Sequence, residues 1–187
     1  MFEERDGRVA DGSLGVDRST GASKVAYENP WQRVMQTSLT VDGQRRELFT
    51  TDYGERAAVV VVRDGEVLLT RQYRYLIDRI SWEIPGGRVD PGEPPEVAAA
   101  RECAEETGVR CPSLQPLIFF HPGLDTLHNP THLFVCEDSE GDPAPGHETL
   151  AAAWVPVDQA LRWASDGTIV DSLSIIGLLA YTARMRA

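Results

Sequence analysis

The chain has 187 residues, of which 42% are apolar and 25% charged, and its formal net charge is -11. This composition is that of an ordinary globular protein with one domain and enough apolar residues for a core. The strong acidity disfavours non-specific binding to nucleic acids, because such binding relies on Lys and Arg side chains that neutralise phosphates.

Residues 1–25 are rich in Gly, Ser, Asp and Arg without periodicity, so we predict a flexible N-terminal segment there. Its first part, MFEERDGRVADG, lacks the apolar run of a signal peptide, and no segment approaches the about 20 apolar residues of a membrane span. We therefore expect a cytoplasmic protein in which residues 26–187 form a single domain.

The first half of this domain is predicted to consist of strands. VMQTSLTV and RRELFTT, joined by the turn DGQ, place N-terminal strands in residues 26–54. AAVVVV and EVLLTRQYR flank Asp64-Gly65, which is a strong signal for a two-residue hairpin turn. RISWEIP is a further strand, and the glycines of PGG end it.

The second half mixes helices and strands. The segment from Pro94 to Thr107 predicts a helix, and Gly108 suits a left-handed C-terminal cap. LIFF, THLFVCE and TLAAAWVP are predicted strands, whereas VDQALRWAS and the run from Asp171 to about Arg186 are predicted helices, with Asp171 as N-cap. This irregular order favours an α+β fold with a mixed sheet over a regular parallel α/β fold.

Three glutamates stand close together in the helix that follows PGG: Glu102, Glu105 and Glu106. At about 100° per residue, their side chains fall on one helix face. Like charges at this spacing repel unless a cation lies between them, and carboxylate oxygens are the ligands that Mg²⁺ or Mn²⁺ prefers. The pattern predicts a divalent-metal site, with a solvated glutamate-rich face as the alternative for any one of these residues.

The same helical projection predicts how the helix packs. Val97, Ala100 and Ala104 point away from the carboxylates, so we expect them to face a core. Ala98 and Ala99 fall on the carboxylate face, where their small side chains leave room for a bulky group. Gly86-Gly87, before the helix, lets the backbone approach the same place closely.

The spacing of the fixed residues is more specific than the charge alone. The pattern G-x5-E-x7-R-E-U-x-E-E-x-G-U, with U apolar, is matched at every fixed letter by Gly87, Glu93, Arg101, Glu102, Glu105, Glu106 and Gly108. With each letter at roughly 7% of residues, chance agreement is on the order of 10⁻⁸ per starting position. This pattern is the Nudix box, so the chain resembles the Nudix hydrolases.

The cysteines do not predict a site of their own. Cys103, Cys111 and Cys136 are odd in number and lack C-x-x-C spacing, which argues against a disulfide framework or a thiolate zinc site. Cys103 stands at the first apolar position of the box, where Ile, Leu or Val is usual. We interpret it as a buried core residue rather than a nucleophile.

Text outside the box is similar to the ADP-ribose pyrophosphatase branch of this family, from about residue 26 onward. The similar stretches are AYENPWQRV, RQYRY, WEIPGG and WVPVDQAL…DGTIVDSLSIIGLLAY. The resemblance implies a Nudix-type mixed β-sheet sandwiched between α-helices, with an N-terminal antiparallel β extension. It also implies hydrolysis of the diphosphate bond of a nucleoside diphosphate linked to another moiety, with Mg²⁺ or Mn²⁺ as cofactor.

The substrate is less sharply implied. ADP-ribose, cleaved to AMP and ribose 5-phosphate, leads over nucleotide sugars such as GDP-mannose and over a nucleotide intermediate of secondary metabolism. These alternatives stay open because PGG replaces the PAG of the branch, and because HPGLDTLHNPTHLF has Asp125 without a neighbouring Glu.

The resemblance assigns metal-binding roles within the box. Glu102 and Glu106 are expected to bind the metal directly, with the carbonyl of Gly86 completing one shell. Glu105 is expected to be a further ligand or a carboxylate that positions water.

Further residues are expected to act in catalysis. Glu93 and Arg101 are expected to form an ion pair that orients the helix. Glu148, on the loop CEDSEGDPAPGHETL, is the candidate general base, with Glu105 as the rival and an ordinary loop carboxylate as the alternative. Glu137 and Glu140 on the same loop fit less well.

Substrate binding is expected of three residues near the box. Arg74 resembles the family arginine that contacts substrate phosphates or the terminal ribose, with a surface salt bridge as the alternative. Glu83 and Gly87 lie in WEIPGG, next to the predicted site. The resemblance further implies a homodimer in which the strands of residues 26–54 exchange between subunits.

Two other function classes fit less well. A Nudix-fold ligand sensor without turnover would lack box glutamates and carry a DNA-binding domain, whereas every box carboxylate is present here. A polynucleotide substrate, as in messenger-RNA decapping, would need a basic stripe interleaved with aromatic residues. We therefore expect a small-molecule substrate and no nucleic-acid partner.

Overall fold

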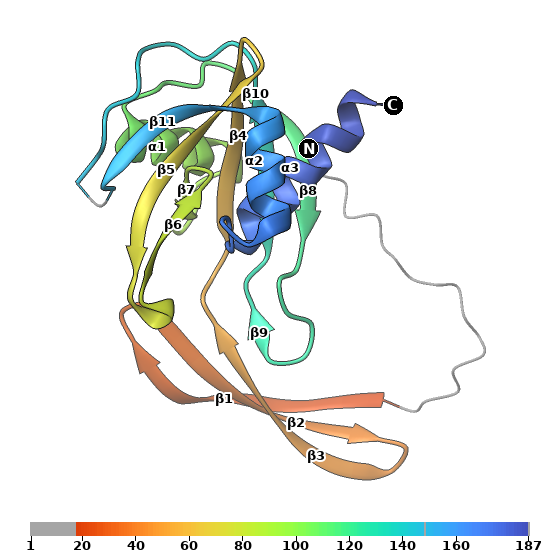
Figure 1. The fold of residues 1–187 in the computed structure, drawn as a ribbon. Coiled ribbons are helices and arrows are strands. Elements are labelled where there is room, and N and C mark those ends of the chain that lie inside the picture. The colour runs from red at the N-terminus through yellow and green to blue at the C-terminus, as the bar shows by residue number, and fades with distance from the viewer. Residues whose placement is uncertain (1–17, 148, 187) are drawn as a thin grey trace. The chain divides into compact units, whose positions relative to one another are not determined.

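The computed structural model describes residues 18–147 and 149–186 (Figure 1). Contacts within the chain define two compact units. Among the described residues, the smaller unit comprises residues 18–54 and His121–Pro130, and the larger comprises Glu55–Phe120 and residues 131–147 and 149–186. The first boundary coincides with the predicted end of the N-terminal strands, whereas the sequence did not predict that the segment 121–130 joins them.

The smaller unit is one mixed sheet with the order β1-β2-β3-β9. β1 pairs with β2 and β2 with β3 in antiparallel fashion, whereas β3 and β9 are parallel. Its strands are β1 (Arg18–Asn29), β2 (Gln32–Val41), β3 (Gln44–Asp52) and β9 (Leu127–His128).

The first strand begins earlier than predicted. Arg18 pairs with Val41, so residues 18–25 belong to a strand and not to a flexible segment. This Ser- and Gly-rich segment has a weak intrinsic strand propensity, so its strand conformation depends on pairing with β2. β1 therefore begins eight residues before the predicted start of the strands at residue 26, and the rest of the predicted flexible segment, residues 1–17, lies outside the described residues.

The larger unit holds a mixed sheet of order β11-β5-β4-β10-β8, with β6 paired to β5 and β7 paired to β4. β4 and β10 are parallel and the other pairs antiparallel. Its strands are β4 (Arg56–Arg63), β5 (Glu66–Arg74), β6 (Arg79–Glu83), β7 (Gly86–Arg88), β8 (Gln115–Phe120), β10 (Thr131–Cys136) and β11 (Ala151–Pro156). A short 3₁₀ turn, η1 (Tyr75–Ile77), links β5 and β6.

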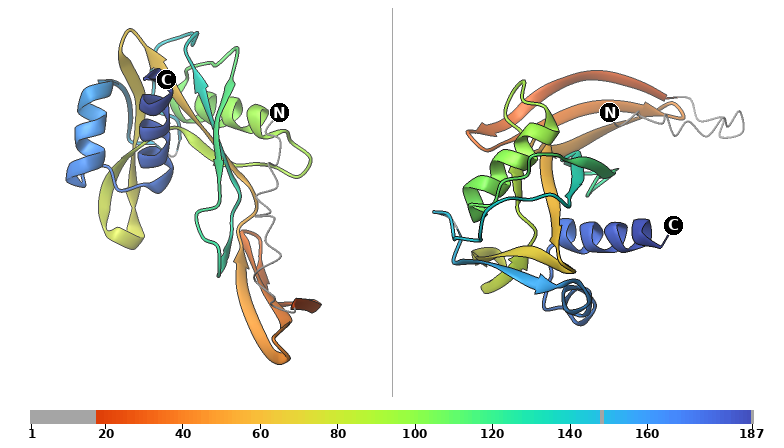
Figure 2. Two further views of the ribbon diagram at one scale, coloured as in Figure 1. Left: turned by 90° about the vertical axis from the view of Figure 1, so that its right-hand side faces the viewer. Right: turned by 90° about the horizontal axis from the view of Figure 1, so that it is seen from above.

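Helices cover both faces of this sheet (Figure 2). α1 (Pro95–Thr107) packs on one face, while α2 (Val157–Asp166) and α3 (Ser172–Met185) pack on the other. Covering from both sides explains why residues 57–61 of the central strand β4 are 0% exposed and continuously apolar. The predicted α+β fold, a mixed sheet between helices, is confirmed.

The turn and the helix caps predicted from local sequence signals are confirmed. Asp64 and Gly65 both have positive φ, of 51° and 80°, as a two-residue hairpin turn requires. Gly108 caps α1 with φ 72°, and Asp171 caps α3 by accepting a hydrogen bond from the Ser174 N–H at 2.8 Å. No helix among the described residues is both long and apolar enough to cross a membrane.

The predicted buried face of α1 was wrong. Ala98, Ala99 and Cys103 are fully buried, whereas Val97 is 50% exposed and Ala104 is exposed. The core side of α1 is therefore the side predicted to carry the carboxylates. The helical projection gave the relative angles correctly, but only the packing of α1 against β4 and β7 decides which face is covered.

The three cysteines are buried and free, as expected. The Sγ atoms of Cys103 and Cys111 lie 3.7 Å apart, which is a contact between thiols rather than a disulfide. Cys103 packs as a core residue at 0% exposure, in agreement with its interpretation as a small hydrophobic residue.

Two buried hydroxyls on neighbouring strands offer a test of stability. Ser81 and Thr70 are both 0% exposed, but Thr70 Oγ1 donates to the Glu83 carbonyl at 3.2 Å, while Ser81 Oγ has no partner among the described residues. We expect Ser81→Ala to raise the free energy of unfolding by about 1 kcal/mol, because it removes an unsatisfied polar atom. Thr70→Val should lower it by about as much, because it leaves a buried carbonyl without its donor.

Urea denaturation of both variants beside the unsubstituted protein measures the two effects. Equal losses of stability in Ser81→Ala and Thr70→Val would contradict the difference in hydrogen bonding.

Candidate active site

The box glycines bring the backbone of β7 against a carboxylate of α1. A Cβ atom built on Gly87 would lie 2.2 Å from Cδ of Glu102, so the carboxylate occupies the space that any other side chain would fill. Gly86 faces the sheet instead, where a Cβ would lie 2.3 Å from the Cβ of Ala58. Both glycines are needed for close approach, and they leave Glu102 in contact with the backbone.

Glu106 lies beside the same glycines and is held by neutral donors. Its Oε1 accepts a hydrogen bond from Nε2 of Gln72 at 2.7 Å, and its Oε2 accepts one from the N–H of Gly86 at 3.0 Å. The pKa of Glu106 is raised to about 7, mainly by burial and also by the charges of Glu102 and Glu83, while the two hydrogen-bond donors oppose the rise. Both of these donors are uncharged, so they orient the carboxylate without forming an ion pair with it.

Arg101 connects the remaining box carboxylates. Its Nε and Nη2 donate to the two oxygens of Glu93 at 3.0 and 2.9 Å, so the predicted ion pair is present and bidentate. Its Nη1 donates to Glu102 at 3.0 Å and to Glu105 at 3.2 Å. A further bond from Nη2 to the Arg88 carbonyl at 3.0 Å ties the helix to β7.

The burial of the three glutamates differs. Glu102 and Glu106 are half-buried, whereas the side chain of Glu105 is 60% exposed and turns toward Arg101. Burial also raises the pKa of Glu102, although the Arg101 guanidinium opposes this rise. The predicted common face therefore separates into a covered pair and one exposed carboxylate.

Arg74 and Glu83, both predicted to bind substrate, contact each other. Nε of Arg74 donates to Oε1 of Glu83 at 2.8 Å, and its Nη2 donates to Oε2. The hydrogen bonds that Arg74 donates to Glu83, which is only 6% exposed, raise the pKa of Arg74, and the charge of Glu106 adds to that effect. Arg74 remains partly exposed in this ion pair. It lies on the same face of the sheet as Gln72, because the two residues are two positions apart in β5.

The loop that precedes β11 attaches to the C-terminal end of α1. The N–H of Gly146 and the hydroxyl of Thr149 donate to the carbonyl of Glu106 at 3.0 and 2.9 Å, and the N–H of Ala144 donates to the carbonyl of Thr107 at 2.7 Å. Glu148, the predicted base, lies outside the described residues.

The two poorer candidates on that loop are engaged away from the box. Glu137 accepts a hydrogen bond from the Tyr181 hydroxyl at 3.3 Å, and Glu140 pairs with Arg110 at 2.9 Å.

The box carboxylates were predicted to bind a divalent metal. In residues 18–147 and 149–186, no three His, Cys, Asp or Glu side chains form a ready-made metal site. The donor chemistry nevertheless fits a hard divalent cation, because two half-buried carboxylates, Glu102 and Glu106, flank one glycine pair and burial raises the pKa of both. A cation there would offset the cost of burying their charges.

Sequence reasoning missed Gln72 altogether. Gln72 contacts Glu106 across a separation of 34 residues, so no local pattern could have indicated the contact. Gln72 belongs to the stretch RQYR, which was noted in the sequence, but only Arg74 in that stretch was assigned a role.

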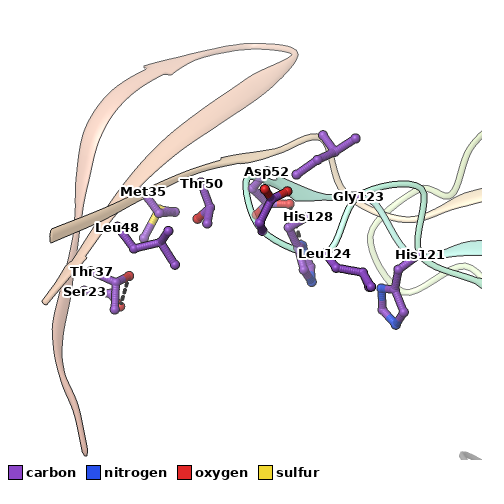
Figure 3. Close-up of a pocket in the computed structure, with 12 residues that line it drawn as sticks. Ser23, Met35, Thr37, Leu48, Thr50, Asp52, His121, Gly123, Leu124 and His128 are labelled. Atoms are coloured by element: carbon purple, nitrogen blue, oxygen red, sulfur yellow. Dashed lines mark hydrogen bonds and ion pairs between the residues drawn. The ribbon is translucent and has the colours of Figure 1, made fainter. Parts of the chain in front are cut away.

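A pocket of about 550 Å³ lies within the smaller unit (Figure 3). His128 Nδ1 and Asp52 Oδ1 are 2.9 Å apart in this pocket, and the hydroxyls of Ser23 and Thr37, at the end opposite His121, are 2.8 Å apart. No residue predicted to act in catalysis, metal binding or substrate binding lines it. Its lining residues are Ser23, Met35, Thr37, Leu48, Thr50, Asp52, His121, Gly123, Leu124, Asp125, Leu127 and His128.

Known proteins are similar to this chain in sequence and in fold. A CMP-5'-(N-acetyl-N-hydroxy-3-aminopropyl)phosphonate hydrolase of Streptomyces rubellomurinus is 36% identical over 128 residues, which are 66% of this chain and 62% of that protein. An ADP-ribose pyrophosphatase of Mycobacterium tuberculosis is 34% identical over 136 residues, 70% of this chain and 66% of that protein. The chain thus matches just under two thirds of the length of each relative.

A solved structure described as an ADP compounds hydrolase has the same fold, with a TM-score of 0.77 at 19% identity, over 90% of this chain and 94% of that one. The resemblance to the ADP-ribose pyrophosphatase branch, predicted from the sequence, is confirmed by the Mycobacterium tuberculosis relative. The NUDIX domain family matches residues 53–173, more than half of the chain. The chain therefore belongs to the Nudix family.

Proposed function

We propose that this protein is a divalent-metal-dependent Nudix pyrophosphohydrolase, which cleaves the diphosphate bond of a nucleoside diphosphate linked to another moiety. The observation that carries the proposal is the covered pair of carboxylates, Glu102 and Glu106, packed against Gly86-Gly87 inside a complete box. A solvated acidic face would leave these carboxylates in water and would not need two glycines to admit them.

The proposed mechanism divides the work between the box residues. Glu102, Glu106 and the carbonyl of Gly86 would hold Mg²⁺ or Mn²⁺. Such an ion neutralises diphosphate oxygens and lowers the pKa of a bound water. Arg101 positions Glu102 through its hydrogen bond, and its ion pair with Glu93 fixes the guanidinium in turn.

The remaining steps involve a base and a phosphate contact. Glu105 is exposed and reaches solvent beside the box, and Glu148 stays the other candidate to accept the proton of the attacking water. Arg74, held by Glu83, would contact the substrate phosphates through the part of its guanidinium that remains exposed.

Two substrates have specific support. ADP-ribose, which would give AMP and ribose 5-phosphate, is supported by the flanking sequence and by the pyrophosphatase relative of Mycobacterium tuberculosis. A CMP-linked phosphonate is supported by the hydrolase of Streptomyces rubellomurinus, in line with the predicted alternative of secondary metabolism. Nucleotide sugars of the GDP-mannose type stay a third prediction.

A homodimer is also proposed, formed through the strands of the smaller unit. Large apolar side chains are exposed on this sheet, with Tyr27 at 54% and Phe49 at 51% exposure, and on the turn between β1 and β2, with Trp31 at 73%. A second copy of the sheet would cover them. A cytoplasmic location stays a prediction from the sequence.

The test is hydrolysis of a substrate panel with and without metal. The purified protein is incubated with ADP-ribose, a CMP-linked phosphonate, GDP-mannose, nucleoside triphosphates and a capped RNA, and nucleoside monophosphate release is measured. We expect turnover of one small substrate with Mg²⁺ or Mn²⁺ and none in excess EDTA, because the carboxylates alone cannot neutralise a diphosphate.

Turnover that survives EDTA would overturn the metal-dependent reaction. Ligand binding without turnover would favour a sensor, and cleavage of the RNA alone would favour a polynucleotide substrate.

A further inference from the structure

The carboxylates of the box are held in two different ways. Glu102 and Glu105 share the positive charge of Arg101, which lies 3.0 and 3.2 Å from their oxygens. Glu106 receives only the amide of Gln72 and the backbone N–H of Gly86 from the described residues. Neutral donors orient a carboxylate without cancelling its charge, whereas a guanidinium competes with any cation for that charge.

Gln72 is well placed to act as such a neutral donor. It is 7% exposed and lies on β5 in the sheet of the larger unit, so its side chain has little conformational freedom. Its Nε2 lies 2.7 Å from Oε1 of Glu106, the shorter of the two contacts that this carboxylate makes. Each carboxylate oxygen has two lone-pair sites, so one bond to each oxygen leaves the others open for a cation.

The geometry points to Gln72 as a positioning residue that orients Glu106 for a divalent cation. This inference rests on the proposed function and adds a residue outside the box to the machinery of that site. Outer-shell partners of metal ligands fix the direction of the ligand lone pairs, and their loss typically weakens metal binding 10–100-fold.

The experiment measures metal affinity in the absence of substrate. Gln72→Met keeps the length and burial of the side chain and removes the donor. We expect its dissociation constant for Mn²⁺, followed by electron paramagnetic resonance or calorimetry, to rise about tenfold or more. Its kcat should return toward that of the unsubstituted protein as Mn²⁺ is raised, which a purely structural defect would not allow.

A matched control removes the same kind of hydrogen bond elsewhere. Gln36 donates from Nε2 to Oε2 of Glu47 at 3.2 Å, within the smaller unit. Gln36→Met should therefore leave the Mn²⁺ dissociation constant unchanged. If Gln72→Met does not fold, Gln72→Asn, which withdraws the amide by one carbon, is expected to weaken Mn²⁺ binding in the same direction.

The outcomes separate this inference from the proposed function. If the unsubstituted protein binds Mn²⁺ and loses it in Glu106→Gln, while the Gln72 variant that folds binds as tightly as the unsubstituted protein, the positioning role is overturned and the proposed function stands. If Glu106→Gln binds Mn²⁺ as well as the unsubstituted protein does, the box is not the metal site and the proposed function itself fails.

Discussion

Glu106→Gln is expected to lower kcat about 10³-fold, which corresponds to about 4 kcal/mol of lost transition-state stabilisation. The substitution keeps the shape of the side chain, so the packing of α1 should survive. It removes a half-buried negative charge that would face a divalent cation, and a neutral amide is a far poorer ligand for Mg²⁺. Steady-state kinetics at saturating metal, with circular dichroism to verify the fold, measures the effect.

The control for this prediction is Glu96→Gln. Glu96 is exposed in the first turn of the same helix and carries the same charge. Its replacement changes the net charge of the protein equally, so kcat should stay within about twofold of the unsubstituted value, as for a surface change far from the reacting groups. A comparable loss in both variants would show that the effect comes from overall charge and would contradict a ligand role for Glu106.

Gly87→Ala is expected to lower kcat/KM about 10²-fold without a large change in stability. The added Cβ would stand 2.2 Å from Cδ of Glu102 and 2.3 Å from its Oε1. These atoms form the free end of a side chain, which can rotate away, so the cost falls on the position of the carboxylate. Displacement of a reacting group or ligand by about 1 Å is enough for a loss of this size.

Gly86→Ala provides the contrast, because its Cβ would meet the sheet. It would lie 2.3 Å from Cβ and 2.6 Å from Cα of Ala58, a residue at 0% exposure in β4. A strand in the middle of a packed core cannot rotate away, so we expect a loss of about 3 kcal/mol in the free energy of unfolding. Thermal unfolding and kinetics of both variants decide the matter. Similar stability losses for the two would contradict the assignment of Glu102 to the space beside Gly87.

The sequence predicted those features whose information is local. The spacing of the box, the caps at Gly108 and Asp171, and the turn at Asp64-Gly65 depend on residues within a few positions of one another. Such features follow from backbone conformation and helical periodicity, which a single sequence contains. The ion pair of Glu93 and Arg101 was expected from the resemblance of the box to the Nudix hydrolases.

Features that depend on distant partners were missed or misjudged. Val97 was expected in the core and is exposed. The face of α1 that packs against β4 and β7 carries Ala98 and Ala99 instead. Gln72 gave no signal, since its function depends on a strand and a helix that only the tertiary fold brings together. The early start of β1 at Arg18 likewise depends on β2 rather than on its own residues.

The pairing of β9 with β3 has a consequence for synthesis of the protein. Thr51 pairs with Leu127 and Asp52 with His128, so the smaller unit closes only when the chain has reached β9. During synthesis, β1, β2 and β3 leave the ribosome first. Their sheet is completed only after more than half of the larger unit has been synthesised. Contacts of such long sequence separation also carry a high entropic cost of loop closure. The edge of β3 at Thr51 and Asp52 therefore stays unpaired until Leu127 and His128 have been synthesised, and an unpaired edge can pair with a wrong strand.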